Sequence, residues 1–484
     1  EIASCLVGSE MCIRDSPQSH IPLYSQLYSA VRSSIEKGEI AAGERLPSKR
    51  ELASHLKISV VTVESAYSQL CAEGYIHSKP GSGFYAEKIQ SRLASENMDI
   101  PHIDKEPPED NYKYDFGTNR ADTAFFPFSS WAKLSREVLN SQSEDLLNSC
   151  GPYGTAELRV QIAAYLKSFR GMNVNPKQIV VGAGSEYLTG LIIQLLGRER
   201  SYGIENPGYG KIYRIFKQNC MKTVPIAMDG YGADIRNVFD NTDIFHITPS
   251  HHFPLGTIMP VSRRQEILGM VYSENGKYII EDDYDSEFRF SGKPIPTLQS
   301  MDTGERVIYI NTFTKTLAPS MRISYMVLPP HLVTAYRKRL GFYACTVPVF
   351  EQITLSEFLK QGFFERHISR MRKLYRKKRD IFLTAAEEWK RKGTVIISGE
   401  DSGLHFLMRV RNSMTESGLL ESAAAHGIGI HGLSEYYWTD KESAPESRIV
   451  IGYSGMDGEA IREAASLLSL IHISEPTRQE AISY

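Results

Sequence analysis

The fold of this 484-residue chain is constrained most by a series of short apolar segments that recur after about residue 113. Five of them have the length and composition of buried strands: "QIVVGAG", "YGIENPGYG", "DIFHITPS", "KYIIEDDYD" and "RVIYINTF". Alternation of such strands with helical stretches is typical of an α/β domain. The sequence therefore predicts one large α/β domain over residues 113–466.

Residues 17–87 have a different pattern, that of short helices followed by a hairpin. In "IPLYSQLYSAVRSSIEKG" apolar residues recur at 23, 27, 31 and 35, which predicts a helix that ends at Gly38. Ser48 and Glu51 have the spacing of a capping box, and Ser59 is placed to cap a further helix. The expected buried face of that helix consists of Val63, Ala66, Tyr67 and Leu70. With two short strands around the Pro-Gly turn of "YIHSKPGSGFYAE", the order is that of a winged helix-turn-helix.

The segment between the two predicted domains has a composition of its own. Residues 88–112 are polar and contain prolines, so they are expected to form an interdomain linker.

Residues 6–16 and 468–478 read as translations of the two strands of one DNA string, which resembles a transposase adapter used in sequencing libraries. We therefore expect residues 1–16 and 467–484 to be assembly artefacts. A signal peptide is the alternative for the start, but "EMCIRD" interrupts any apolar core.

The overall composition points to no partner by itself. A net charge of −2 favours neither nucleic acid nor membrane binding, so any such function has to come from local motifs. No apolar run approaches the roughly 20 residues of a membrane span. The six cysteines include no CxxC pair, which indicates a reduced, cytoplasmic protein with neither a disulfide framework nor a metal site.

Lys315 follows directly on a predicted buried strand, in "RVIYINTFTK". A lysine in this place is costly to desolvate unless a partner or a covalent bond uses it. The alternative is an ordinary lysine of a surface loop. Which of the two holds depends on the residues that accompany it.

An acid and a phenol occur together in "YIIEDDYDSEF", where β alternation places Asp282 and Tyr284 on one face. A carboxylate can hold a pyridine nitrogen protonated, and a phenol can hydrogen-bond a phenolate oxygen. The alternative for this segment is an ordinary acidic loop. The two side chains suit one aromatic ligand that carries both groups.

Phosphate-binding and stacking groups occur in three other segments. "VGAGSEYL" runs from a strand into a helix, so the backbone around Gly184 and the Ser185 side chain can cradle a phosphate. Thr312 and Arg322 flank Lys315 and add phosphate donors. Tyr209 in "NPGYG" can lie flat against an aromatic ring. All these residues together describe a site for pyridoxal 5′-phosphate.

The arrangement resembles the fold-type I aminotransferases over residues 113 to about 466. The resemblance implies a large PLP-dependent transferase fold-type I domain, in which Lys315 bonds to the cofactor aldehyde and "GPYGTAELR" (151–159) lines the active site or the dimer seam. Aminotransferases brace the cofactor oxygen with an asparagine where this chain has Phe253. They also bind the substrate carboxylate with an arginine near the C-terminus, for which Arg448 is the candidate here, as the anchor of an effector carboxylate.

The segment "AGERLPSKRELASHLKISVVTVESAYSQLCAEGYIHSKPGSGFYA" resembles the DNA-binding domain of the GntR superfamily. Relatives often carry a basic residue where this chain has Val60, and residues 17–87 hold as many acidic as basic residues. A winged helix used only for protein contacts is the alternative. The resemblance implies that the following residues face DNA or shape the wing tip: Arg45, Ser48, Lys49, Arg50, Thr62, Gly81 and Gly83.

The two domains together resemble the MocR-type branch of the GntR regulators, and most closely its GABA-responsive type. This implies an α/β chain that forms a homodimer through its aminotransferase-like domains, senses an amine, an amino acid or pyridoxal phosphate, and controls operator binding without a membrane. The departure at Gly455, where an arginine would follow the last strand, allows an effector other than GABA. One alternative is an active PLP-dependent aminotransferase with an accessory N-terminal domain, and another is a repressor with a dead cofactor pocket.

Residues 366–380, "RHISRMRKLYRKKRD", carry eight Lys and Arg residues. They can be interpreted as a nucleic-acid patch or as an amphipathic helix with a solvated basic face. Ile368, Met371, Tyr375 and Phe382 keep helical spacing, which favours the amphipathic helix.

Overall fold

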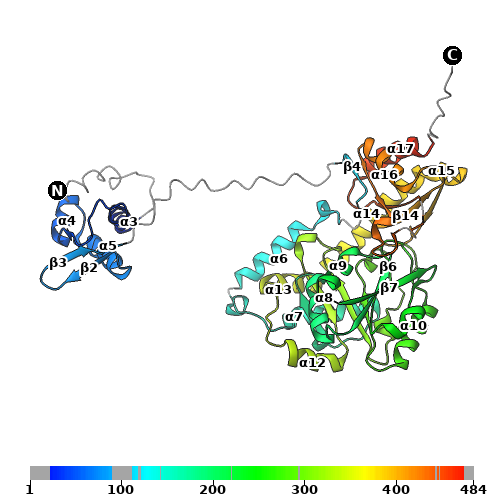
Figure 1. The fold of residues 1–484 in the computed structure, drawn as a ribbon, viewed down its shortest axis with the longest axis horizontal. Coiled ribbons are helices and arrows are strands. Elements are labelled where there is room, and N and C mark those ends of the chain that lie inside the picture. The colour runs from blue at the N-terminus through cyan, green and yellow to red at the C-terminus, as the bar shows by residue number, and fades with distance from the viewer. Residues whose placement is uncertain are drawn as a thin grey trace, which may run out of the picture. The chain divides into compact units, whose positions relative to one another are not determined.

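The chain divides into two compact units, Glu1–Pro108 and Glu109–Tyr484 (Figure 1). The predicted linker lies outside the described residues except at its two ends, and the predicted artefact at the start lies wholly outside them. The computed structural model describes residues 22–89, 112–117, 121–141, 143–219, 221–292, 295–441, 444–445 and 447–473.

The helices of the first unit begin where the local sequence offers caps. They are α3 (Leu23–Glu36), α4 (Lys49–Leu56) and α5 (Val60–Ala72). The predicted capping box of α4 is confirmed, because Ser48 Oγ accepts a hydrogen bond from Glu51 N and the Glu51 carboxylate accepts one from Ser48 N. Ser59 caps α5 through Thr62 N. The residues predicted to form the inner face of α5 are all buried: Val63, Ala66, Tyr67 and Leu70.

The wing of the first unit is a small antiparallel sheet in the order β1-β3-β2. Its strands are β1 (Arg45–Leu46), β2 (Ile76–Lys79) and β3 (Gly83–Ala86). The hairpin β2–β3 was predicted from the sequence. Strand β1 was missed because two residues are too few to show any periodicity.

The second unit is built on a mixed sheet with the strand order β5-β12-β11-β10-β9-β6-β7-β8 among the described residues. Strands β8 and β12 run against the others. All five apolar segments named above form strands of this sheet. The strands are β5 (Ile179–Gly182), β6 (Ser201–Asn206), β7 (Lys222–Asp229), β8 (Gly232–Asp234), β9 (Ile244–Ile247), β10 (Tyr278–Asp282), β11 (Val307–Thr312) and β12 (Ser324–Val327).

Helices cover both faces of this sheet (Figure 1). One face, which includes Ile280 and Ile310, packs against α8 (Ser185–Leu196), α9 (Gly210–Gln218) and α12 (Pro330–Leu340). Because side chains alternate along a strand, Asp282 and Thr312 continue this face at the carboxyl ends of β10 and β11. The opposite face packs against α7 (Ala156–Arg170), α10 (Val261–Ser273), α13 (Val349–Lys360) and α14 (Phe363–Ala385).

The C-terminal part of this unit forms a second layer around an antiparallel sheet in the order β13-β14-β17-β16. Its strands are β13 (Val395–Ser398), β14 (His405–Val410), β16 (His431–Gly432) and β17 (Arg448–Gly452), and a separate parallel pair joins β4 (Tyr114–Asp115) to β15 (Ile428–Gly429). Within the described part of this unit, the other helices are α6 (Phe128–Asn140), α11 (Leu298–Met301), α15 (Glu387–Lys392), α16 (Glu416–Ala425) and α17 (Gly458–Ile473). Helix α17 extends into the predicted artefactual tail and buries Leu468 there. Within the described ranges, no helix is long and apolar enough to span a membrane.

Helix α14 contains the basic stretch 366–380 and is amphipathic, as its spacing predicted. The predicted apolar face is buried, but the expectation of a solvated basic face is partly wrong. Lys378 is buried against Asp122, with their charged atoms 2.6 Å apart. Arg372 and Arg379 donate hydrogen bonds to the backbone carbonyls of Glu287 and Glu400, both at 2.9 Å. Long basic side chains can reach such acceptors across a packed neighbour, which residue spacing cannot reveal.

Candidate cofactor site and nucleic-acid interface

A cavity of about 400 Å³ lies at the carboxyl ends of β10 and β11, where α8 and α9 begin. Seven of the eight residues predicted to bind the cofactor line this cavity: Ser185, Tyr209, Asp282, Tyr284, Thr312, Lys315 and Arg322. Ser185 starts α8, and the other six lie at strand ends or in the loops that follow strands. The eighth predicted residue, Gly184, is the N-cap of α8. The fold thus brings together residues that lie as far apart in the sequence as Gly184 and Arg322.

Lys315 lies in the loop after β11 and is partly buried. Burial lowers the pKa of its amine, although the nearby Asp285 and Asp282 carboxylates act in the opposite direction. A larger neutral fraction makes the amine a better nucleophile toward a carbonyl carbon. The position fits a covalent role better than that of a solvated surface lysine.

Asp282 ends β10 on the floor of the same cavity. Burial raises its pKa to about 7, with further contributions from Asp283 and Asp285. His246 Nε2 lies 3.7 Å from Asp282 Oδ2, but burial lowers the pKa of His246 to about 4, so this imidazole is neutral. A protonated ring nitrogen beside Asp282 would supply the missing positive charge and restore the carboxylate.

The start of α8 and Arg322 form an anion cradle. Gly184 has a φ of 100°, and a Cβ at this position would overlap the Arg322 guanidinium. Arg322 itself adopts a left-handed conformation with a φ of 48°, and its Nη2 lies 3.0 Å from Glu186 Oε2. Glu186 also pairs with Lys211. Two cations that already hold a carboxylate, next to a helix N-terminus, have the chemistry needed for a phosphate group.

Thr312 and Tyr209 complete two walls of the cavity. The Thr312 hydroxyl accepts hydrogen bonds from Ser324 Oγ (2.8 Å) and Thr314 N (3.1 Å), so its orientation is fixed. Tyr209 precedes α9 and is 44% exposed. Its ring meets the Phe253 ring edge to face at 6.0 Å, which leaves a flat aromatic surface on the cavity wall.

Sequence reasoning missed several residues of this cavity, among them Glu205, His246 and Thr248. Glu205 is buried and accepts hydrogen bonds from Thr248 N (3.0 Å) and Thr248 Oγ1 (2.6 Å), and burial raises its pKa to about 8. A signal was present, because Glu205 and His246 each follow an apolar residue within a segment predicted to be a buried strand. Such a residue is costly to bury unless it serves a site.

Arg448, the candidate for an effector carboxylate, lies elsewhere. It lines a second cavity of about 820 Å³ together with Asn206, Ser398 and Tyr437, and it is not among the residues that line the first cavity. Phe253 lines the first cavity and is only 3% exposed.

The residues predicted to face DNA occupy the helix starts and the wing of the first unit. Arg45 on β1 lies against the wing, since a Cβ at Gly83 would come within 3.2 Å of Arg45 Nε. Gly81 and Gly83 have φ values of 72° and 119°, as a tight wing turn requires. Arg50 is exposed on the first turn of α4.

Three of the predicted DNA contacts are partly engaged within the unit. Lys49 Nζ lies 2.6 Å from Glu64 Oε1, and the Thr62 hydroxyl lies 2.8 Å from Ser59 Oγ. Ser48 is used as the α4 cap. Val61, which is not among the predicted contacts, is 69% exposed at the start of α5.

Comparison with known families covers both units. Residues 23–86 match the family described as bacterial regulatory proteins, gntR family, and residues 112–468 match aminotransferase class I and II. An uncharacterised HTH-type transcriptional regulator of Bacillus subtilis (strain 168), YdeL, is 42% identical over 93% of this chain and 96% of its own length. The probable rhizopine catabolism regulatory protein MocR of Rhizobium meliloti is 29% identical over 93% of each chain. The pyridoxine biosynthesis transcriptional regulator PdxR of Corynebacterium glutamicum is 27% identical over 94% and 97%.

Among solved structures, a kynurenine aminotransferase of Pyrococcus horikoshii superposes with a TM-score of 0.66 at 22% identity, covering 75% of this chain and 91% of that one. A likeness at this identity shows the fold of the second unit. The fused domains and the full-length relatives show more: this chain belongs to the MocR-type regulators of the GntR family, which join a DNA-binding winged helix-turn-helix to an aminotransferase-like domain.

Proposed function

We propose that this transcriptional regulator holds pyridoxal 5′-phosphate at Lys315, binds a small amine or amino acid there, and changes its affinity for operator DNA in response. The observation that carries the proposal is the single cavity that gathers Lys315, Asp282 and Arg322 in a chain that also has a winged helix. A regulator that only bound DNA would have no use for a partly buried lysine beside two carboxyl groups, because desolvating these groups is costly.

The residues present fit the cofactor at each of its polar ends. Pyridoxal phosphate, when bound, supplies an aldehyde that bonds reversibly to amines and a ring that withdraws electrons. Lys315 would hold the aldehyde carbon, Asp282 the ring nitrogen, and the cradle of Gly184, Ser185 and Arg322 the phosphate. The Gly184 position supports this fit, since the missing Cβ opens the space beside the Arg322 guanidinium.

The ligand that best suits this chemistry carries a primary amine, because only an amine can compete with Lys315 for the aldehyde. The relatives carry names that refer to different compounds, rhizopine for MocR and pyridoxine for PdxR, so membership of the family does not select the ligand. Pyridoxal phosphate itself is a second candidate for the effector. We propose a homodimer through the second unit as the working form, active in the cytoplasm, where the operator DNA lies.

An aminotransferase that turns over substrate is the second candidate function, favoured by the preserved set of Lys315, Asp282 and Tyr284 and by the fold of the second unit. One experiment separates the two. The purified protein is mixed with a panel of amines and amino acids, and the visible absorption of the cofactor, keto acid release and binding to DNA upstream of its own gene are followed in parallel. A spectral change with altered DNA affinity and no keto acid supports the regulator that senses an amine. Release of keto acid with unchanged DNA affinity contradicts it.

A further inference from the structure

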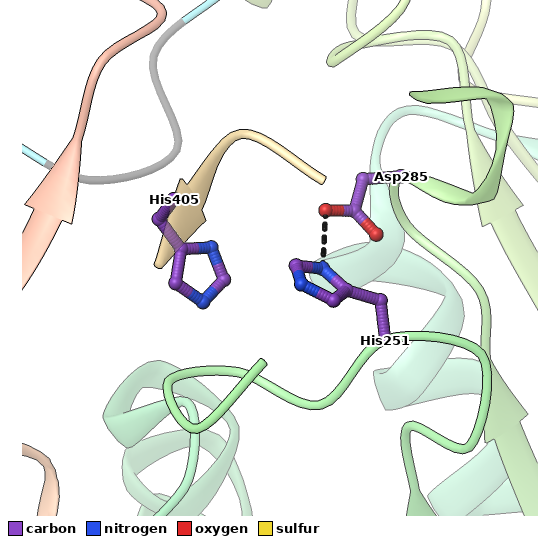
Figure 2. Close-up of side chains that lie close together, drawn as sticks. All are labelled: His251, Asp285 and His405. Atoms are coloured by element: carbon purple, nitrogen blue, oxygen red, sulfur yellow. Dashed lines mark hydrogen bonds and ion pairs between the residues drawn. The ribbon is translucent and has the colours of Figure 1, made fainter. Parts of the chain in front are cut away.

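A buried hydrogen-bonded group lies directly behind the cofactor cavity. His251 and Asp285 follow β9 and β10, and His405 begins β14 of the C-terminal layer (Figure 2). All three side chains are at most 1% exposed. Tyr284 lines the cavity, and its hydroxyl oxygen contacts His251 of the group. Phe253 also lines the cavity and packs against the His405 ring, with centroids 5.0 Å apart.

The distances around His251 Nδ1 decide how protons are arranged. Asp285 Oδ2 lies 2.8 Å from Nδ1 and the Tyr284 hydroxyl oxygen lies 3.2 Å from the same atom. Asp285 Oδ2 is the nearer of the two oxygens, so the Nδ1 hydrogen donates to it. A protonated Nδ1 has no lone pair and cannot accept the Tyr284 hydrogen. The phenol hydrogen is therefore directed to other acceptors, which are the neighbouring Asp285 carboxyl and an acceptor in the cavity.

The state of Tyr284 agrees with a donor role. Burial, with added effect from the Asp285 and Asp282 carboxylates, raises the pKa of its phenol, so the hydroxyl keeps its hydrogen. Phe253, in the same cavity wall, has no donor to offer.

The C-terminal layer encloses the pair from the other side. The His405 ring packs against His251 with centroids 4.9 Å apart, and His405 Nε2 lies 3.2 Å from the Pro254 carbonyl oxygen. A Cβ at Gly403 would overlap the His251 ring, so a glycine with a φ of 75° is needed there. This close packing keeps His251 from turning away from Asp285.

His251, Asp285 and His405 also have the side-chain types of a metal site, with potential ligand atoms within 4.8 Å of one another. The contact between His251 Nδ1 and Asp285 Oδ2 at 2.8 Å argues for a hydrogen bond instead. Two ligands on a tetrahedral zinc with bonds of about 2.0–2.1 Å lie roughly 3.3 Å apart. The observed spacing is that of a donor and an acceptor.

We propose that His251 and Asp285 are positioning residues: Asp285 keeps the proton on His251 Nδ1, and the Tyr284 hydroxyl is thereby directed toward the ring oxygen of a bound cofactor. The inference rests on the proposed function, since it needs a cofactor in the cavity. It adds a pair that acts through Tyr284 without touching the ligand. Without Asp285, Nδ1 would accept the phenol hydrogen and withdraw it from the cavity.

Matched substitutions at His251 test the proposal. An asparagine can place its amide nitrogen where Nδ1 lies, whereas a glutamine reaches the place of Nε2. We expect His251→Asn to keep a cofactor dissociation constant within about threefold of the native value. His251→Gln and Asp285→Asn should weaken cofactor binding about ten- to hundredfold, as the loss of a hydrogen bond to a charged group does. In His251→Gln and Asp285→Asn, the pH midpoint of the change in the cofactor's visible absorption should shift in the same direction as it does in Tyr284→Phe.

A double-substitution cycle separates positioning from general damage. In the Tyr284→Phe background, His251→Gln should have no further effect on cofactor affinity, because the hydroxyl it positions is gone. Additive losses would show a merely structural role and overturn the proposal, as would equal behaviour of His251→Asn and His251→Gln. The exposed His426→Asn is the control for purification and loading.

Two further results keep the test decisive. If both His251 variants fail to fold, Asp285→Asn alone decides by the same spectral shift. The protein could instead contain one equivalent of metal that a chelator removes, with loss of the pH midpoint of the cofactor's visible absorption. That result would overturn the proposal in favour of a metal centre. Failure of the proposed function is distinct, because the native protein would then bind no pyridoxal phosphate at all.

Discussion

Gly184 and Arg322 lie so close that the guanidinium occupies the space a Cβ of residue 184 would need. The left-handed φ at Gly184 would itself strain any larger residue. We expect Gly184→Ala to displace Arg322 and to weaken cofactor binding at least tenfold. The measurement is equilibrium dialysis of pyridoxal phosphate. Gly190→Ala in the middle of the same helix meets no atom within 4 Å and should bind normally, with a gain in stability of up to about 1 kcal/mol.

Lys315→Ala should abolish the covalent attachment of the cofactor. Burial lowers the pKa of the Lys315 amine, and this is the feature that suits it for the bond. Borohydride reduction followed by peptide mapping measures the attachment. A label that moves to another lysine in the variant would refute the assignment, and the exposed Lys360→Ala serves as the control.

The cofactor-free protein should depend on pH through Asp282. Its pKa is about 7 in the folded chain, compared with about 3.9 for an exposed aspartate, so the folded state binds more protons between these values. The contribution of this carboxyl to stability is therefore lost as the pH rises through that window. The melting temperature of Asp282→Asn should rise progressively relative to that of the native protein from about pH 4 to pH 7. Above pH 7 the difference between the two melting temperatures should stay constant.

Thermal unfolding across this range checks the pH prediction. The exposed Asp240→Asn should show no such trend. A difference between Asp282→Asn and the native protein that does not vary with pH would mean that Asp282 titrates normally. With the cofactor present, the native protein should have the higher melting temperature, because the asparagine cannot balance a protonated ring nitrogen.

Arg50→Ala should weaken operator binding and reduce its dependence on salt. Arg50 is exposed on the first turn of α4, and each phosphate contact contributes about 0.9 to the slope of log affinity against log salt. Binding isotherms at several salt concentrations give this slope. The control is Lys37→Ala at the C-terminal end of α3, which should leave the slope unchanged. An unaltered slope for Arg50→Ala would remove Arg50 from the interface.

The effector and the operator should influence each other equally if the chain is a sensor. Allosteric coupling is typically about 1–3 kcal/mol and is reciprocal, so an amine that changes operator affinity by a factor must have its own affinity changed by that factor. Both affinities are to be measured on one protein at fixed salt with the cofactor saturating. Binding of the amine with no change in DNA affinity or transcription would contradict sensing and favour turnover.

The fold was largely predictable because its signals are local. Caps such as Ser48 and Ser59 and the five apolar strands depend on neighbours in the sequence, and the structure confirms them. Strand β1 and the pairing of β4 with β15 were not predictable, since strands of two residues carry no period and are defined by partners far along the chain.

The sequence by itself determined which chemical groups are present near the end of each strand, from Asp282 and Tyr284 to Lys315. Only the tertiary structure decided which of these groups meet. It placed Arg448 in another cavity, turned Lys378 toward Asp122, and set Asp285 against His251. The physical reason is that burial and contacts between distant segments fix the cost of a charge and the direction of a proton, and neither is encoded in the spacing of residues along the chain.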